Sequence, residues 1–166
     1  MAGKEEKIIT TINRSDLVNA FTPKRAKLLR QKGQVLKIHE ILFLGYVFVE
    51  TDVAYKDFIQ HLNQHIKPVQ GFVRLLERDH TGTQSLYPHE RSFIESFTNH
   101  QRIIETSTGF IEGDKIIITE GPLVGHESQI KRIDRHKKIA ELDISMFGQI
   151  RKIKVSCEIL SKTNAE

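Results

Sequence analysis

The segment 113–133 constrains the fold most strongly, because it combines strand patterns with turn-forming residues in a short span. Isoleucines fill its first half, between Lys115 and Thr119, and this β-branched content favours a strand over a helix. The Gly121-Pro122 pair ends that strand, and Gly125 permits a backbone turn that a Cβ would hinder. A second apolar run begins at Ile130. We therefore expect two short strands joined by a glycine-rich turn.

A phosphate-binding loop is the alternative interpretation of this turn, since glycine-rich turns can cradle phosphates with backbone N–H groups. The Walker A pattern has four residues between its glycines, followed by Lys and then Ser or Thr. Here three residues separate Gly121 from Gly125, and His126 follows. The spacing excludes this nucleotide-binding motif.

The length of 166 residues suits two small domains. A net charge of +4 favours a polyanionic partner, although a solvated basic surface has the same composition. Cys157 is the single cysteine, so an intrachain disulfide is excluded. It lies in an apolar strand pattern, which indicates a packed thiol. The sequence has no apolar run long enough to span a bilayer, so we expect a soluble, monomeric cytoplasmic protein without a membrane contact.

The first hundred residues alternate helical and strand patterns in the order αββαβα. The two longer helices are expected to bury Phe58, Ile59, Leu62 and Ile66, and Phe93, Ile94 and Phe97, respectively. A polar link over 106–109 follows, and we place a domain boundary near residue 105. The expected elements are a helix over 4–13, a strand over 18–21, a basic hairpin that turns at Gly33 and has a buried second strand over 38–49, a helix over 53–66 capped by Asp52, a strand over 72–76, a loop over 79–84 and a helix that begins at Pro88.

The ordered set of Gly-Asp, strand, Gly-Pro-Leu-Val-Gly and second strand resembles the KOW motif, a small β-barrel module of NusG transcription factors and several ribosomal proteins. The run 42–49, LFLGYVFV, resembles the Phe-Pro-Gly-Tyr stretch of the NusG amino-terminal (NGN) domain, with Leu44 in place of the proline. The resemblance implies an α+β chain. It implies an NGN-like domain over 1–104, an αβ sandwich with an antiparallel sheet. A linker over 105–111 and a five-stranded SH3-like KOW β-barrel over 112–166 are expected to follow.

One departure from the family concerns its first strand. In the family a strand carrying Trp-Tyr precedes a Gly-Lys-Glu-Glu stretch, whereas here that stretch is residues 3–6 and the chain has no Trp. We expect the NGN-like domain to lack this strand, to have an open sheet groove and to be less stable, because the missing strand leaves backbone groups unpaired.

Two further segments, 133–138 and 146–148, resemble LoaP-type paralogs of the family, which act as processive antiterminators. In the general factor the strand after the matching Phe-Gly is mainly apolar and acidic and contacts ribosomal protein or termination factor. Here the equivalent residues 149–154 are basic, which favours binding of an anion. We therefore expect the KOW module to bind a nascent RNA hairpin.

Basic residues gather in three clusters that could track phosphates. The null alternative is a charged surface that keeps the protein soluble. Within the third cluster, residues 152 and 154 share one face of a strand while Ile153 and Val155 face the core, which predicts a one-sided basic stripe. The candidate RNA-binding residues are Lys131, Arg132, Arg135, His136, Lys137, Lys138, Arg151, Lys152 and Lys154, and a secondary nucleic-acid contact is assigned to Lys24, Arg25, Lys27, Arg30 and Lys32.

Phe43 and Tyr46 are the candidate polymerase-binding residues. The resemblance implies that they belong to an apolar patch that grips the clamp helices of RNA polymerase, in its largest subunits. Burial in the protein's own core is an equal alternative for Phe43, since both roles need an apolar side chain.

Catalysis is not expected. His61 and His65 share a helix face, but the residue after His61 is Leu62, so the HExxH metalloprotease pattern is absent. Cys157 has no metal-spaced partner, and the sequence holds no nucleophile elbow. We expect no catalytic residue, cofactor or metal.

The expected function is that of an elongation factor acting as a processive antiterminator. The alternatives are a general NusG-type factor that couples polymerase to ribosome or termination factor, and a ribosome-associated KOW protein.

Overall fold

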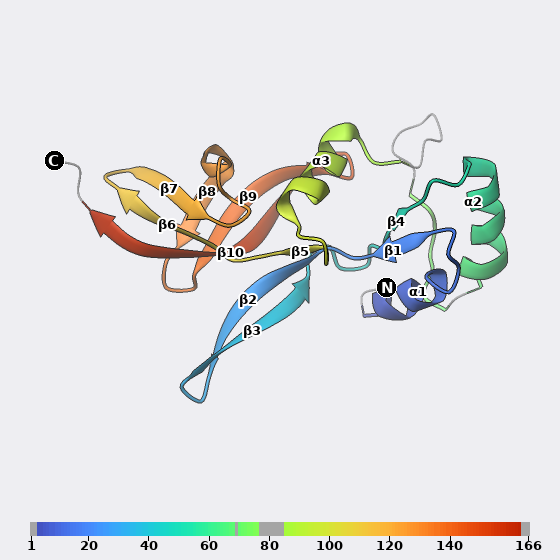
Figure 1. Cartoon of the computed structure of the whole chain (residues 1–166), viewed down its shortest axis with the longest axis horizontal. Coiled ribbons are helices and arrows are strands. Elements are labelled where there is room, and N and C mark those ends of the chain that lie inside the picture. Colours follow the sequence, from blue (N-terminus) through green and yellow to red (C-terminus); the bar gives the residue numbers. More distant parts are fainter. Residues whose placement is uncertain (1–2, 69, 77–84, 164–166) are drawn as a thin grey trace. The chain divides into compact units, whose positions relative to one another are not determined.

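The computed structural model describes residues 3–68, 70–76 and 85–163, and the chain forms two compact units (Figure 1). The first unit comprises residues 1–22 and 41–84, and the second comprises residues 23–40 and 85–166. The units are interleaved in sequence, whereas the boundary near residue 105 divides the chain once. That boundary stays a prediction.

The first unit packs two helices against a two-stranded antiparallel sheet. Its core consists of the apolar faces of the helices together with Val18 and Ala20, at the start of the first strand. Of the face predicted for the helix over 53–66, Phe58, Leu62 and Ile66 are buried together, and Ile59 is half-buried and packs against them. The elements are α1 (Glu5–Ile12), β1 (Asn19–Phe21), β4 (Phe48–Glu50) and α2 (Tyr55–His61), which continues as the π-helical turn η1 (Leu62–Ile66).

A buried carboxylate fixes the start of α1. Glu5 is 2% exposed, and its carboxylate accepts hydrogen bonds from the N–H groups of Gly3 and Gly45, both at 2.6 Å. Burial raises the pKa of Glu5, but backbone N–H groups outweigh that effect and hold this pKa below its ordinary value of 4.5. The charged side chain therefore joins α1 to the loop that follows β3 (Gln34–Ile41).

The second unit contains a basic hairpin, a helix and a five-stranded sheet. The hairpin strands β2 (Lys24–Gln31) and β3 form a three-stranded sheet with the short β5 (Ile103–Ile104), which runs parallel to β2. The helix α3 (Pro88–Phe97) begins at Pro88 and buries Phe93, Ile94 and Phe97, as predicted. The five-stranded sheet contains β6 (Ser107–Glu112), β7 (Lys115–Glu120), β8 (Ile130–Asp134), β9 (Ile139–Met146) and β10 (Gln149–Thr163), in the order β7-β6-β10-β9-β8.

The predicted closure of this sheet into a barrel is wrong. Within the described residues β7 and β8 are the two edges, and no ladder joins them. The long strand β10 pairs antiparallel with β9 over residues 149–156, and then parallel with β6, with a register shift between Ile159 and Ser161. Between the two edge strands the chain turns and passes through the short 3₁₀ helix η2 (Glu127–Gln129), so the edges are joined by a connection instead of by hydrogen bonds.

The glycine-rich turn has a structural role. Gly121 has φ of +92°, and a Cβ there would lie 2.6 Å from the Cα of Ser107. The Ser107 hydroxyl accepts the N–H of Leu123 at 3.1 Å, and Leu123 is completely buried. The turn thus closes one end of the sheet's core.

Three local predictions are corrected. The apolar run 38–49 is not one buried strand, because β3 ends at Ile41 and Gly45 turns the chain with φ of +84° before β4 begins. The helix over 53–66 starts at Tyr55 with Ala54 as its N-cap, so Asp52 does not cap it. Residues 72–76 form no strand with any described segment. The predicted loop over 79–84 lies outside the described residues.

Candidate nucleic-acid and polymerase interfaces

The alternation predicted for β10 is confirmed. Lys152 and Lys154 are exposed, whereas Ile153 and Val155 are 5% and 1% exposed. Arg151 lies on the other side of the strand: it is half-buried, and its guanidinium carbon is 5.1 Å from the centroid of the Phe147 ring. The structure therefore separates Arg151 from the two lysines that the sequence placed beside it.

The exposed face of these strands is of mixed charge. Lys154 lies opposite Glu141 of β9, and its Nζ forms an ion pair with this carboxylate at 3.3 Å. On the other side of β9, Arg132 of β8 is the register partner of Glu141. Lys152 lies opposite Asp143. Residues opposite each other on paired strands share a face of the sheet. The carboxylates of β9 therefore interrupt the basic stripe predicted for β10.

The turn between β8 and β9 presents the cations most openly. Arg135, His136 and Lys137 are exposed. The carboxylate of Asp134 accepts the backbone N–H of Lys137 at 3.0 Å, and this hydrogen bond holds the pKa of Asp134 below its ordinary value of 3.8. Lys138 forms an ion pair with Glu158. Asp134 thus orders the turn, and the side chains of residues 135–137 are exposed to solvent.

The basic hairpin lies against this part of the sheet. The Arg25 guanidinium donates to the backbone carbonyl of Lys154 and, at 2.9 Å, to Glu40. Lys27 binds the same carboxylate at 2.6 Å, and this hydrogen bond from Lys27 is the main cause of the lowered pKa of Glu40. Residues 25–28 and 137–139 line the same cavity, of about 90 Å³. The structure therefore brings the first basic cluster beside the other two.

The cations differ in how much of their charge is compensated. Arg25, Lys27, Lys137, Lys138 and Lys154 form ion pairs with carboxylates, and Lys24 is half-buried. The pair of Lys154 with Glu141 depends on strand register, and those of Arg25 and Lys27 with Glu40 join the two strands of the hairpin, so the spacing of the cations alone does not predict them. The exposed candidates on the hairpin are Arg30 and Lys32, and those on the sheet are Lys131, Arg132, Arg135, His136 and Lys152 in addition to the paired Lys137 and Lys154.

The Phe43 side chain lies in the interior of the first unit. This side chain is 5% exposed and its ring lies 5.9 Å from that of Phe48, which stacks at 5.7 Å on Phe21. Tyr46 is half-buried, and its backbone N–H binds the Phe43 carbonyl at 3.2 Å. Between them Leu44 is 65% exposed, because the turn at Gly45 points it outward. Leu44 is thus an exposed apolar side chain that the sequence analysis did not single out.

Catalytic features do not appear in the described part of the chain. Its His, Cys, Asp and Glu side chains form no group of three or more that could hold a metal ion. Cys157 is completely buried, and burial raises the pKa of its thiol to about 11, so little of it is the reactive thiolate at neutral pH. Among residues 3–68, 70–76 and 85–163, no helix is both long and apolar enough to span a membrane.

Comparison with known proteins identifies the family. A family model described as "NusG: Transcription termination factor nusG" matches residues 1–98. The transcription termination/antitermination protein NusG of Pasteurella multocida is 25% identical over 138 residues, which cover 80% of this chain and 70% of that protein. The NusG protein of Rickettsia felis is 20% identical over 134 residues, covering 81% and 67%. The chain therefore belongs to the NusG family of transcription factors, which have no catalytic activity.

Proposed function

We propose that the protein is a processive antiterminator that binds RNA polymerase through its first unit and a nascent RNA hairpin through the cations of its second unit. The observation that carries the RNA assignment is the packing of the basic hairpin β2–β3 beside the β8–β9 turn. The contact through Arg25 and the backbone of Lys154 holds two groups of exposed cations on one folded unit. Phosphates of a folded RNA could contact both groups.

The chemistry of these side chains suits a duplex better than a single strand. Duplex RNA is recognised largely by shape and by phosphate and 2′-OH contacts, which Arg and Lys provide. Single-strand binding relies on exposed aromatic side chains that stack on bases. Phe147, the aromatic residue that contacts Arg151 of β10, is half-buried. The interrupting carboxylates Glu141 and Asp143 would favour binding at the turn and the hairpin tip over binding along the strands.

Polymerase binding is proposed from family membership and from the turn after β3. Leu44 is exposed there, and Tyr46 is half-buried behind it. A helix of a partner that docks on an apolar surface needs such anchors. Phe43 supports this turn from the core and does not contact the partner directly. A polymerase pull-down should weaken with Leu44→Asp and remain unchanged with the exposed Lys7→Asp on α1.

RNA binding is tested by a salt titration of affinity for a short hairpin RNA. Two double variants, R30A/K32A at the hairpin tip and R135A/K137A at the β8–β9 turn, remove two exposed cations each. Each should weaken binding and reduce the slope of log affinity against log salt by about 1–2, since one phosphate contact contributes about 0.7–0.9. K115A removes an exposed cation at the start of β7 and serves as the matched control. Unchanged slopes in both double variants would refute the RNA assignment.

A general NusG-type role is the second candidate, and the β9–β10 turn favours it. Ile150 is 72% exposed beside Phe147, and the neighbouring face is of mixed charge, as in a protein-docking surface. Such a factor would use this turn to bind ribosomal protein or termination factor. Antitermination that does not require an RNA hairpin would support this role. A ribosome-associated protein without a polymerase contact is disfavoured, because the NusG match covers residues 1–98.

A further inference from the structure

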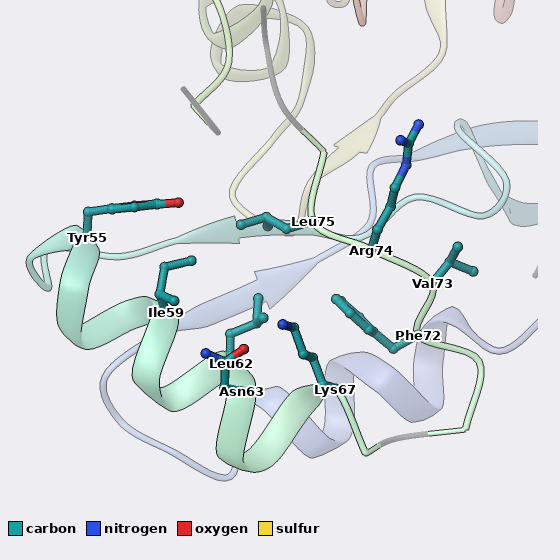
Figure 2. Close-up of a pocket in the computed structure, with 9 residues that line it drawn as sticks. All are labelled: Tyr55, Ile59, Leu62, Asn63, Lys67, Phe72, Val73, Arg74 and Leu75. Carbon is teal, nitrogen blue, oxygen red and sulfur yellow. The ribbon is translucent and has the colours of Figure 1, made fainter. Parts of the chain in front are cut away.

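A groove in the first unit lies outside the candidate RNA-binding and polymerase-binding surfaces. It runs between α2 with its continuation η1 and the segment 72–75, and has a volume of about 520 Å³ (Figure 2). Tyr55, Ile59 and Leu62 approach it from the helical side, and Phe72 and Leu75 approach it from the other. None of its lining residues belongs to the candidate RNA or polymerase sets.

The floor of the groove is apolar. Ile59, Phe72 and Leu75 are half-buried and pack against the core of the first unit, to which Leu62 belongs. At the rim Tyr55 is 57% exposed and Val73 is 72% exposed. An apolar floor with large exposed side chains beside it is typical of an interaction site, since covering this surface removes apolar area from water.

The rim carries charge of one sign. Lys67 and Arg74 are exposed and line the groove, whereas none of the nine described residues that line it is acidic. Figure 2 shows the Lys67 side chain directed into the space between the helix and the segment, whereas the Arg74 side chain extends from the segment away from the helix. A ligand that fills this groove with apolar side chains would therefore gain from carboxylates placed beside them.

The openness of the groove argues for a peptide instead of a small molecule. Of the lining residues only Leu62 is buried, and five are exposed. Small-molecule pockets enclose most of their ligand's surface, which this shallow groove could not do. A chain segment needs to bury only the side chains of one face, and about 520 Å³ accommodates a few of them.

We propose that this groove binds an acidic peptide segment of a protein partner, with apolar side chains on the floor formed by Ile59, Leu62 and Phe72. Carboxylates of the peptide pair with Lys67 and Arg74 at the rim. The site is independent of RNA binding, which uses the second unit.

Selection from a phage-displayed library of random dodecapeptides on the full chain tests the proposal. The recovered peptides should combine apolar and acidic residues. The most enriched peptide, made with a fluorescent label, should bind K67E/R74E at least about tenfold more weakly than wild type, because two attractions become repulsions. K56E is the matched control: Lys56 is exposed on α2 but does not line the groove, and its change should alter affinity by less than about twofold.

A second measurement guards against a variant that fails to fold. In the wild-type chain the bound peptide should slow hydrogen exchange of amides in α2 and in the segment 72–75. Recovery of basic peptides, equal affinity of K67E/R74E and K56E, or protection elsewhere in the chain would overturn the proposal. Failure to recover any peptide that depends on the groove would overturn it too. Self-association of the chain that K67E/R74E abolishes would assign the groove to a second copy instead.

Discussion

Removal of the Glu90 side chain is the sharpest test of how α3 and the sheet of the second unit are held together. Glu90 is 2% exposed. One carboxylate oxygen accepts the N–H of Phe147 at 2.5 Å and that of Gly148 at 3.4 Å, in the turn between β9 and β10. The other oxygen accepts the N–H of Tyr87 at 3.0 Å and completes a capping box at the start of α3. A single buried charge thus joins a helix start to a turn 57 residues further along the chain.

The loss of stability expected from removing the Glu90 side chain follows from these hydrogen bonds. A hydrogen bond to a charged group contributes about 1.5–3 kcal/mol, and Glu90→Ala removes two short ones and a long one. We expect Glu90→Ala to destabilise the second unit by about 3–5 kcal/mol, because the abandoned N–H groups lie partly away from water. Glu90→Gln keeps the volume and one acceptor oxygen, so we expect about half that loss.

Cys157 supplies the assay. It is the chain's single cysteine and is completely buried in β10, so its labelling by a thiol reagent under native conditions reports opening of the second unit. Glu90→Ala should raise the labelling rate about 10²–10⁴-fold, since each 1.4 kcal/mol is a factor of about ten. Glu95→Gln is the matched control on the same helix: its exposed ion pair with Arg91 contributes only about 0.3–0.5 kcal/mol. Equal labelling of the Glu90→Ala and Glu95→Gln variants would refute this account of the interface.

Three further predictions follow from single sites. Because the folded pKa of Glu5 lies below 4.5, its stabilisation is present above that pH and is lost as pH falls through the folded pKa; acid titration of the thermal midpoint should be flatter in Glu5→Gln. Gly121→Ala should lower the free energy of unfolding in urea by at least about 2 kcal/mol more than Gly125→Ala does. Both glycines have positive φ, but an added Cβ would collide with backbone atoms at Gly121 and would meet nothing within 4 Å at Gly125. Lys154→Met, which breaks the partly exposed pair with Glu141, should change stability by less than about 1 kcal/mol in the same assay.

The helices could be predicted from sequence because their signals are local. Apolar side chains at helical spacing, such as Phe58 and Leu62, identify a buried face without knowledge of what covers it. Pro88 marks a helix start for an equally local reason, its fixed φ. The apolar run 38–49 misled because strand propensity does not reveal a turn, and only Gly45, with its positive φ, interrupts the run.

The candidate site was predictable only in part. The alternation of Lys152 and Lys154 follows from the geometry of any strand. Their carboxylate partners, Glu141 and Asp143, depend on the register of β10 with β9, which the spacing of residues in one strand does not determine. Closure of the sheet is likewise a property of how its edges meet. The contact of the basic hairpin with β10 joins residues 129 positions apart, so no sequence window could contain it.

The central claim, antitermination that depends on an RNA hairpin bound by the second unit, is tested most directly by terminator readthrough in a reconstituted transcription assay. Templates with and without the hairpin upstream of the terminator are compared, with wild-type protein and with R135A/K137A. The account predicts readthrough on the hairpin template with wild-type protein, and its loss with the variant or without the hairpin. Readthrough of equal extent on both templates, unaffected by R135A/K137A, would contradict the account and support a general elongation factor.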